Sequence, residues 1–260
     1  MLFSIVNFFI YPSLVKKKKA ILIIRLDLIG DYVLFRNFLK ILHKSKKYSN
    51  YKITMLGNNS WCNLCKELDY KYIDEFIWLD RKQFNGNLLY RFKKLREITS
   101  NAYEIVINPT YSREFFYSDT VVKLVNADKK IGSTSDLSNQ TSYELKVSDK
   151  YYTKLIPAKK EVMFEFNRNK EFFELLLENK INLSSPTIFL DEKETSLNLP
   201  KKYAVIFIGA SSKFKKWDVK KFSLIALHLI KKYKHDIVLC GGPNDLEELR
   251  LFRNNFKWNL

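Results

Sequence analysis

The segment KKKKAILIIRLDLIGDYVLFRNFLKIL, residues 16–42, decides the fold class. Its basic start gives way to AILIIR (20–25), a continuous apolar run typical of a strand that is buried on both faces of a parallel sheet. After Gly30 and Asp31, apolar residues recur at helical spacing as far as Leu42. The segment therefore predicts a buried strand, a turn and a helix, which together form the first unit of an α/β fold.

The same alternation of strand-like and helix-like segments continues along the chain. Further strands are predicted at residues 51–57, 73–79, 103–109, 129–133, 203–211 and 236–242. Helices are predicted at residues 31–44, 60–68, 84–99, 113–126, 161–180, 218–234 and from about 244. The polar segment 134–157 is predicted to form a loop or a short hairpin. This order is typical of a parallel sheet with helices on both faces.

Two α/β units are expected in tandem. The first covers residues 1–183, and a connection at 184–202 follows, with Pro186 and Pro200 and without a long apolar period. The second unit, 203–260, shows two clear strands, whereas a doubly wound domain usually has about five or six. We therefore expect this unit to be a partial domain and the chain to be a fragment of a longer protein.

The charge balance is strongly basic, with 45 Lys and Arg against 28 Asp and Glu, a formal charge of +17. Such a field attracts polyanions, namely nucleic acid, anionic lipid surfaces or phosphorylated substrates, and an AT-rich coding bias would equally enrich lysine.

The three cysteines argue against a disulfide framework and fit a reducing cytoplasm. Cys62 and Cys65 are interpreted as small residues on an amphipathic helix.

The first fifteen residues, MLFSIVNFFIYPSLV, are apolar and precede Lys16–Lys19. The stretch is shorter than the roughly 20 apolar residues of a spanning helix, and Pro12 interrupts it. A secretory signal would carry its positive charge before the apolar stretch. Two interpretations remain: an anchor that lies in the interface of an anionic membrane, or a segment packed on the protein surface.

Three stretches carry side chains suited to chemistry, and the first is Arg25-Leu-Asp27-Leu-Ile-Gly30-Asp31. Gly30 is predicted to let the backbone turn sharply at the carboxyl end of a strand, where open α/β sheets bind ligands. Asp31 is predicted at the N-cap or in the first turn of the next helix. A helix cap alone contributes ~1 kcal/mol, so capping and a role in a site are both open on these residues.

The second stretch, GASSKFKKW (209–217), lies between a buried strand and a helix. Its small residues, serines and lysines suit a phosphate, although the spacing is not that of a Walker A loop and an ordinary basic loop is the alternative. The third stretch is CGGPNDLEE (240–248), where a Gly-Gly-Pro turn precedes an acidic helix start. Those carboxylates suit either ribose hydroxyls or the helix dipole.

In this order, R-L-D-x-x-G-D-x-V-L, G-A-S-x(3)-K-K-W and D-I-V-L-x-G-G-P resemble the heptosyltransferase-like glycosyltransferases of family nine, from about Ile21 to Glu248. The resemblance implies a GT-B fold, with two Rossmann-like domains. It also implies inverting transfer of a sugar, expected to be heptose from ADP-heptose, onto a lipopolysaccharide core or related glycan. No cofactor or metal is expected, and the sequence has no Asp-x-Asp pair.

On the acceptor side, the resemblance makes Asp31 the general base that activates an acceptor hydroxyl, with Arg25 and Gly30 in the acceptor-side turn. The middle helix departs from the family pattern, because Phe164 stands where a histidine is usual, although Asn169 is retained. Ile208 likewise replaces a proline that commonly precedes the Gly-Ala-Ser.

On the donor side, the resemblance implies that Lys215 contacts the donor phosphates, with Lys216 and Ser211 or Ser212 nearby. An acidic residue after the Gly-Gly-Pro turn is expected to bind the ribose, and Glu247 is the candidate. The family's late D-x-G-x-x-H stretch, which completes the donor pocket, does not occur in these 260 residues.

The expected partners are a nucleotide-sugar, a lipopolysaccharide core or glycolipid acceptor, and the cytoplasmic surface of the inner membrane, on which the protein would be peripheral. Nucleic acid is not expected, because the aromatic residues follow core periodicity and no binding motif is visible. The alternative function is that of an inactive, truncated remnant that binds only anionic surfaces or partners.

Overall fold

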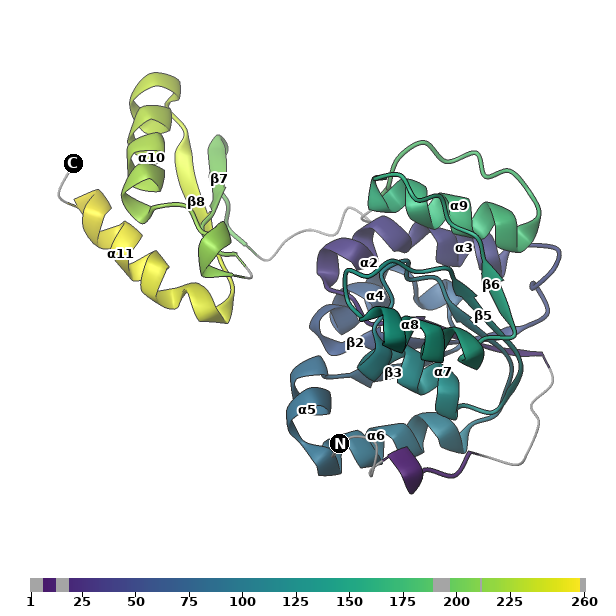
Figure 1. Ribbon diagram of the computed structural model, residues 1–260. Helices are drawn as coiled ribbons and strands as arrows, with labels where there is room; N and C mark the ends of the chain where they lie inside the picture. Colours follow the sequence, from purple (N-terminus) through teal and green to yellow (C-terminus); the bar gives the residue numbers. More distant parts are fainter. Residues whose placement is uncertain (1–6, 13–18, 189–196, 211, 258–260) are drawn as a thin grey trace. The chain divides into compact units, whose positions relative to one another are not determined.

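The computed structural model describes residues 7–12, 19–188, 197–210 and 212–257. The chain forms two compact units, Met1–Leu190 and Asp191–Leu260 (Figure 1). The predicted connection, 184–202, spans the division between them, and its residues 189–196 lie outside the described part. Most of the N-terminal apolar segment and Lys16–Lys18 also lie outside it, so the two interpretations of that segment stay predictions.

A six-stranded parallel sheet forms the centre of the first unit, in the order β3-β2-β1-β4-β5-β6. The strands are β1 (Ala20–Arg25), β2 (Lys52–Asn58), β3 (Glu75–Leu79), β4 (Tyr103–Asn108), β5 (Ala127–Ser133) and β6 (Lys154–Ile156). Ile21 of β1 lies opposite Ile53 on one side and Ile105 on the other. The five strands predicted for this unit are confirmed. The apolar run at residues 20–25 forms β1, which lies between β2 and β4.

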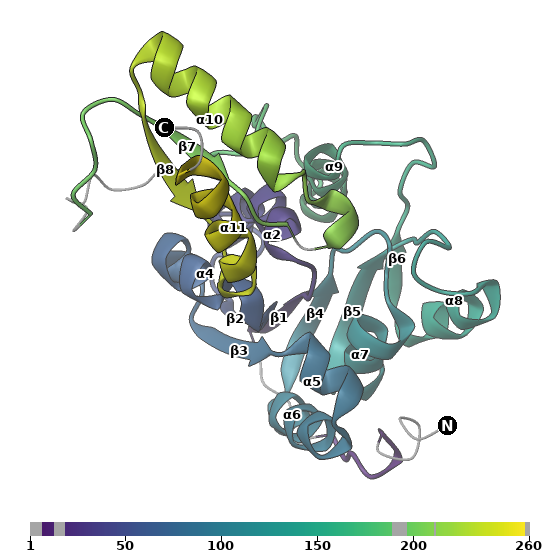
Figure 2. The same cartoon turned by 90° about the vertical axis from the view of Figure 1, so that its left-hand side faces the viewer.

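Helices cover both faces of this sheet (Figures 1 and 2). They are α2 (Ile29–Phe35), α3 (Asn37–His43), α4 (Cys62–Leu68), α5 (Arg81–Gly86), α6 (Leu88–Ser100), α7 (Thr120–Leu124), α8 (Ser142–Ser148) and α9 (Glu165–Leu177). Shorter turns lie at Asn59–Trp61, Tyr70–Tyr72, Phe115–Asp119 and Asp149–Tyr151.

The continuous apolar run of β1 is explained by two separate cores. Ile21 and Ile23 enter a core that α2, α3 and α9 cover, whereas Leu22 and Ile24 enter a core that α5, α6 and α7 cover. Because successive side chains of a strand point to opposite faces, a strand buried on both sides needs an apolar residue at every position.

The segment predicted as one helix, 31–44, is two short helices that meet at Arg36. The Arg36 guanidinium lies against the buried carboxylate of Asp69, to which Nη2 donates a hydrogen bond at 2.8 Å. Tyr32 donates a hydroxyl hydrogen bond of 2.5 Å to the same carboxylate. This buried network ties α2 and the helix junction to the end of α4.

The prediction of a loop or hairpin at 134–157 is wrong, since this segment contains α8 and β6. A capping box begins α8: the Thr141 hydroxyl accepts a hydrogen bond from Glu144 N–H, and the Glu144 carboxylate accepts one from Thr141 N–H. Strand β6 has only three residues and pairs with β5, Lys154 opposite Ile131. Both elements are too short for apolar periodicity to reveal.

The second unit contains two parallel strands, β7 (Tyr203–Phe207) and β8 (Asp236–Cys240), with α10 (Val219–Tyr233) and α11 (Leu246–Lys257). Short turns lie at Lys213–Lys215 and Pro243–Asp245. Its core contains Ile206, Ile208, Ala226 and Phe252. Both predicted strands and both predicted helices are confirmed. Among the described residues of the whole chain, no helix is both long and apolar enough to cross a bilayer.

Packing of α9 against α2 and α3 is predicted to stabilise the first unit substantially. Phe173 is fully buried, and its ring lies 5.3 Å from the ring of Phe38 and 6.0 Å from that of Phe35. Phe173→Ala should lower the free energy of unfolding by about 3–5 kcal/mol, because it leaves a cavity between these helices. Urea unfolding followed by tryptophan fluorescence, to which Trp61 and Trp78 of the first unit contribute, measures the change.

Leu175→Ala on the same helix is the matched control, because Leu175 is 44% exposed. We expect this change to cost only about 0.5 kcal/mol, as is usual for surface positions. Equal losses for the two variants would contradict the packing described for α9.

Candidate active site

A buried guanidinium lies at the carboxyl end of β1. Arg25 is 1% exposed, and its Nε lies 2.8 Å from the carboxylate of Asp27. Nη2 donates to Glu165 Oε1 at 2.8 Å, and Nη1 donates to Asn169 Oδ1 at 3.2 Å. The guanidinium carbon also lies 5.2 Å from the centre of the Phe35 ring. These contacts join the end of β1 to the first turns of α9, about 140 positions later.

Charge on Arg25 is maintained although the side chain is buried. Burial by itself lowers the pKa of Arg25, but the carboxylates of Asp27 and Glu165 outweigh it and the pKa is raised. The buried charge is therefore compensated by neighbours from the turn after β1 and from α9. Arg25 thereby holds the carboxylates of Asp27 and Glu165 at the carboxyl ends of the strands.

Asp27 is fixed from three directions in the turn that follows β1. Its backbone carbonyl accepts hydrogen bonds from Asn58 Nδ2 at 3.2 Å and from Trp61 Nε1 at 2.9 Å. Its carboxylate accepts one from the Thr110 hydroxyl at 3.4 Å, besides its ion pair with Arg25. The loops after β2 and β4 thus position the turn at the edge where parallel α/β sheets bind ligands.

Asp31 is the third residue of α2 and is partly exposed. Leu28 occupies the N-cap position without a side-chain cap, so Asp31 lies in the first turn. Burial and the charge of Asp27 raise the pKa of Asp31, while Arg25 and a backbone hydrogen bond at Leu28 oppose that rise. A partly exposed carboxylate with a raised pKa can accept a proton from a bound molecule.

The sharp turn predicted at Gly30 occurs earlier in the chain. Gly30 is the second residue of α2, and no glycine among the described residues has a positive φ, so the turn does not need glycine here. A Cβ at Gly30 would meet no atom within 4 Å. The glycine therefore leaves open space beside Asp31, and its expected place on the acceptor side stays a prediction.

In the second unit, the loops after β7 and β8 meet at the carboxylate of Asp245, which is 7% exposed. Oδ2 of Asp245 accepts a hydrogen bond from Gly242 N–H at 2.8 Å. A side chain at Gly209 would overlap this carboxylate, so the close approach requires glycine. Lys216 Nζ lies 2.8 Å from Oδ1.

Lys216 also contacts Glu248, so its charge is shared by two carboxylates within the unit. Hydrogen bonds to Asp245 and Glu248 raise the pKa of Lys216, and they lower the pKa of both acids. Lys215 is exposed, and its side chain makes no ion pair within the described part of the chain.

The remaining donor-side residues lie around the same loops. The Ser212 carbonyl accepts a hydrogen bond from Lys215 N–H at 3.0 Å, whereas Ser211 lies outside the described residues. Glu247 is exposed in the first turn of α11. Ser212 and Lys216 thus belong to the loop after β7, and Glu247 belongs to the first turn of α11; their roles toward a donor stay predictions.

Two positioning residues were missed in the sequence. Glu165 pairs with Arg25 and accepts from Asn169 Nδ2, and the spacing of these two acceptors, four positions apart on one helix face, was a usable signal. The sequence prediction names Glu247 and not Asp245, although Asp245 lies three residues after Gly242, where a carboxylate can accept a hydrogen bond from the turn. Among the described residues, no group of three His, Cys, Asp or Glu could hold a metal ion.

The fold and these sites define a class: two Rossmann-like units of GT-B type with polar side chains at the carboxyl ends of their strands. Within that class, the model of glycosyltransferase family 9 (heptosyltransferase) matches residues 91–258, and the chain belongs to this family. No curated protein matches the sequence.

Solved structures of similar fold include the following two. A family 9 glycosyl transferase from Veillonella parvula DSM 2008 matches with a TM-score of 0.66 and 20% identity, over 92% of this chain and 68% of that one. The E. coli heptosyltransferase WaaC with ADP-2-deoxy-2-fluoro heptose matches with a TM-score of 0.64 and 15% identity, over 92% and 74% of the two chains.

Removing the charge of Asp31 is predicted to stabilise the fold at neutral pH. The folded-state pKa of Asp31 is raised, so ionised Asp31 destabilises the fold at any pH above that pKa. This cost disappears as the pH falls below the unfolded value of about 3.9. Asp31→Asn should therefore raise the urea midpoint at pH 7, with a gain that shrinks in acid.

Asp245→Asn supplies a comparison of opposite sign, because the pKa of Asp245 is lowered in the fold. This change should lower the stability of the second unit at pH 7, and the loss should vanish in acid. A lower urea midpoint for Asp31→Asn at pH 7 would contradict the environment described for Asp31.

Proposed function

We propose that the chain carries the acceptor-activating base of an inverting glycosyltransferase, and that this base is Asp31. The observation that carries the proposal is the position of Asp31, partly exposed at the carboxyl end of β1 with a raised pKa. Burial and the charge of Asp27 raise that pKa, and Arg25 holds Asp27 in place.

In the proposed reaction, an acceptor hydroxyl attacks the anomeric carbon of a nucleotide-sugar. The oxygen–carbon bond forms as the bond to the nucleoside diphosphate breaks, and the hydroxyl proton passes to the Asp31 carboxylate. Attack from the face opposite the leaving group inverts the configuration at that carbon. A base on the acceptor side contributes about 10²–10⁴-fold to such a step.

The donor is proposed to bind the loops of the second unit, without a metal ion. Lys216 is held by Asp245 and Glu248, so exposed Lys215 is the better candidate for contact with the donor phosphates, together with Ser211 or Ser212. Positive charge stabilises a departing diphosphate as its negative charge grows.

We propose ADP-heptose as the donor and a lipopolysaccharide core or related glycan as the acceptor. Membership of the heptosyltransferase family supports the sugar, and the E. coli structures of similar fold contain ADP or an ADP-heptose analogue. We further propose that Glu247 binds the ribose and that the protein works at the cytoplasmic face of the inner membrane. The formal charge of +17 suits a phosphorylated acceptor in such a membrane.

Substitution of Asp31 tests the proposal with the full chain. Asp31→Asn should lower kcat for heptose transfer from ADP-heptose to truncated lipopolysaccharide by about 10²–10⁴-fold, because the acceptor proton has no base. ADP binding, measured by calorimetry, should be unchanged, because the donor loops belong to the other unit.

Asp236→Asn is the control, since Asp236 is an exposed carboxylate at the start of β8, at the strand end away from the donor loops. Its transfer rate should equal that of the unaltered chain. Normal turnover by Asp31→Asn would refute the general-base role. If the unaltered chain shows neither transfer nor ADP binding, the remnant alternative is supported instead.

A further inference from the structure

A pocket lies on the flank of the first unit, beside α3 and the segment that follows α9. Its volume is about 1010 Å³, and its lining residues range from Arg36 to Thr187. The walls come from α3 and the turn after it, from the end of α4, and from residues 177–187. Asp31 is not among the lining residues, so the pocket is separate from the proposed acceptor base.

The described residues that line this pocket carry charge of one sign. Seven of the lining side chains are Lys or Arg, and none is Asp or Glu. Three of the seven have carboxylate partners outside the lining: Arg36 pairs with Asp69, Lys47 with Glu178, and Lys180 with Glu174. No carboxylate among the described lining residues therefore balances the positive charge of the pocket.

The other four cations are Lys40, Lys44, Lys46 and Lys71. All four are exposed, and within the described residues their ammonium groups make no ion pair. Lys40 and Lys44 lie one helical turn apart, at the end of α3. Like charges at this spacing repel each other, so their gathering around one hollow costs energy unless an anion enters it.

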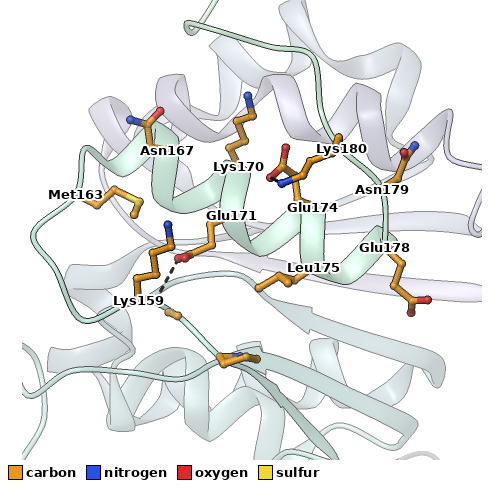
Figure 3. Close-up of a pocket in the computed structure, with 12 residues that line it drawn as sticks. Lys159, Met163, Asn167, Lys170, Glu171, Glu174, Leu175, Glu178, Asn179 and Lys180 are labelled. Carbon is orange, nitrogen blue, oxygen red and sulfur yellow. Dashed lines mark hydrogen bonds and ion pairs between the residues drawn. The ribbon is translucent and has the colours of Figure 1, made fainter.

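A neighbouring groove on α9 shows that positive charge is not a general property of this surface. Figure 3 shows that groove, of about 820 Å³, with Lys159, Lys170 and Lys180 among three glutamates. Lys170 donates to the Leu183 carbonyl, and Lys180 pairs with Glu174. Its charges are balanced locally, whereas those of the α3 pocket are not.

Apolar side chains also contribute to the α3 pocket. Ile41, Leu68, Leu177, Ile181 and Leu183 are among its lining residues. These side chains pack in part on the core of the first unit, and a small inorganic anion would use the lysines and leave the exposed part of this apolar surface uncovered. A ligand that combines phosphate charge with an apolar portion matches both parts of the lining.

We propose that this pocket binds the phosphate-bearing headgroup of a lipid, with the lysines on the phosphate and the apolar residues against the glycerol and first acyl carbons. The ligand can be a bilayer phospholipid or a phosphorylated glycolipid, which share this chemistry. The proposal does not depend on Asp31 or on sugar transfer. Lipid binding can therefore fail while the proposed transfer reaction holds, and the transfer reaction can fail while lipid binding holds.

Vesicle binding with a matched pair of variants tests the proposal. Lys40→Gln/Lys44→Gln removes two pocket charges. Lys146→Gln/Lys150→Gln removes two exposed lysines, also four positions apart, in α8 and in the turn that follows it. Sedimentation with mixed phosphatidylglycerol–phosphatidylcholine vesicles should show about tenfold or greater loss of affinity for the first variant. The second variant should lose much less.

Both variants keep the N-terminal basic run, so a difference between them does not come from that run. Equal losses in the two variants would overturn the proposal, because they would show only a general effect of charge. Calorimetry with inorganic pyrophosphate separates the sources: pocket-dependent binding of pyrophosphate without vesicle binding would overturn a lipid ligand. Pocket-dependent binding to phosphorylated lipopolysaccharide but not to phosphatidylglycerol would support the glycolipid source.

Discussion

The site of the first unit depends on the ion pairs that the buried guanidinium of Arg25 makes with Asp27 and Glu165. The guanidinium lies at the end of the central strand and holds Asp27 of the following turn together with Glu165 and Asn169 of α9. Replacing such a buried charge network by apolar residues is often neutral or stabilising in proteins, so stability alone does not explain it. Its effect here is to fix carboxylates beside the start of α2.

The second unit uses the same arrangement with the charges exchanged. There a buried carboxylate, Asp245, gathers the loops that follow two parallel strands and holds Lys216 beside them. In both units the polar side chains lie at the carboxyl ends of the strands. In each unit one buried charged side chain, Arg25 or Asp245, holds the neighbouring loops and side chains in place. The close approach of Asp245 requires glycine at position 209, whereas Gly30 lies within α2 and has open space at its Cβ position.

Much of the fold could be predicted because its pattern is local. The run Ala20–Ile24 is apolar at every position, as expected of a strand that is buried on both faces. Three features depend on contacts distant in sequence and escaped prediction: the helix break at Arg36 beside Asp69, the pairing of β6, and the partnership of Arg25 with Glu165. Asp31 was found through a family resemblance, whereas its raised pKa needed the structure.

The central claim is that this environment prepares Asp31 to accept a proton. Carbon-13 NMR titration of the aspartate carboxyls measures this directly, with Asp31→Asn to assign the resonance. The account predicts that the resonance absent from the variant titrates above the ordinary aspartate pKa of about 3.9, because burial and Asp27 disfavour the charged form. A pKa at or below that value would contradict the account.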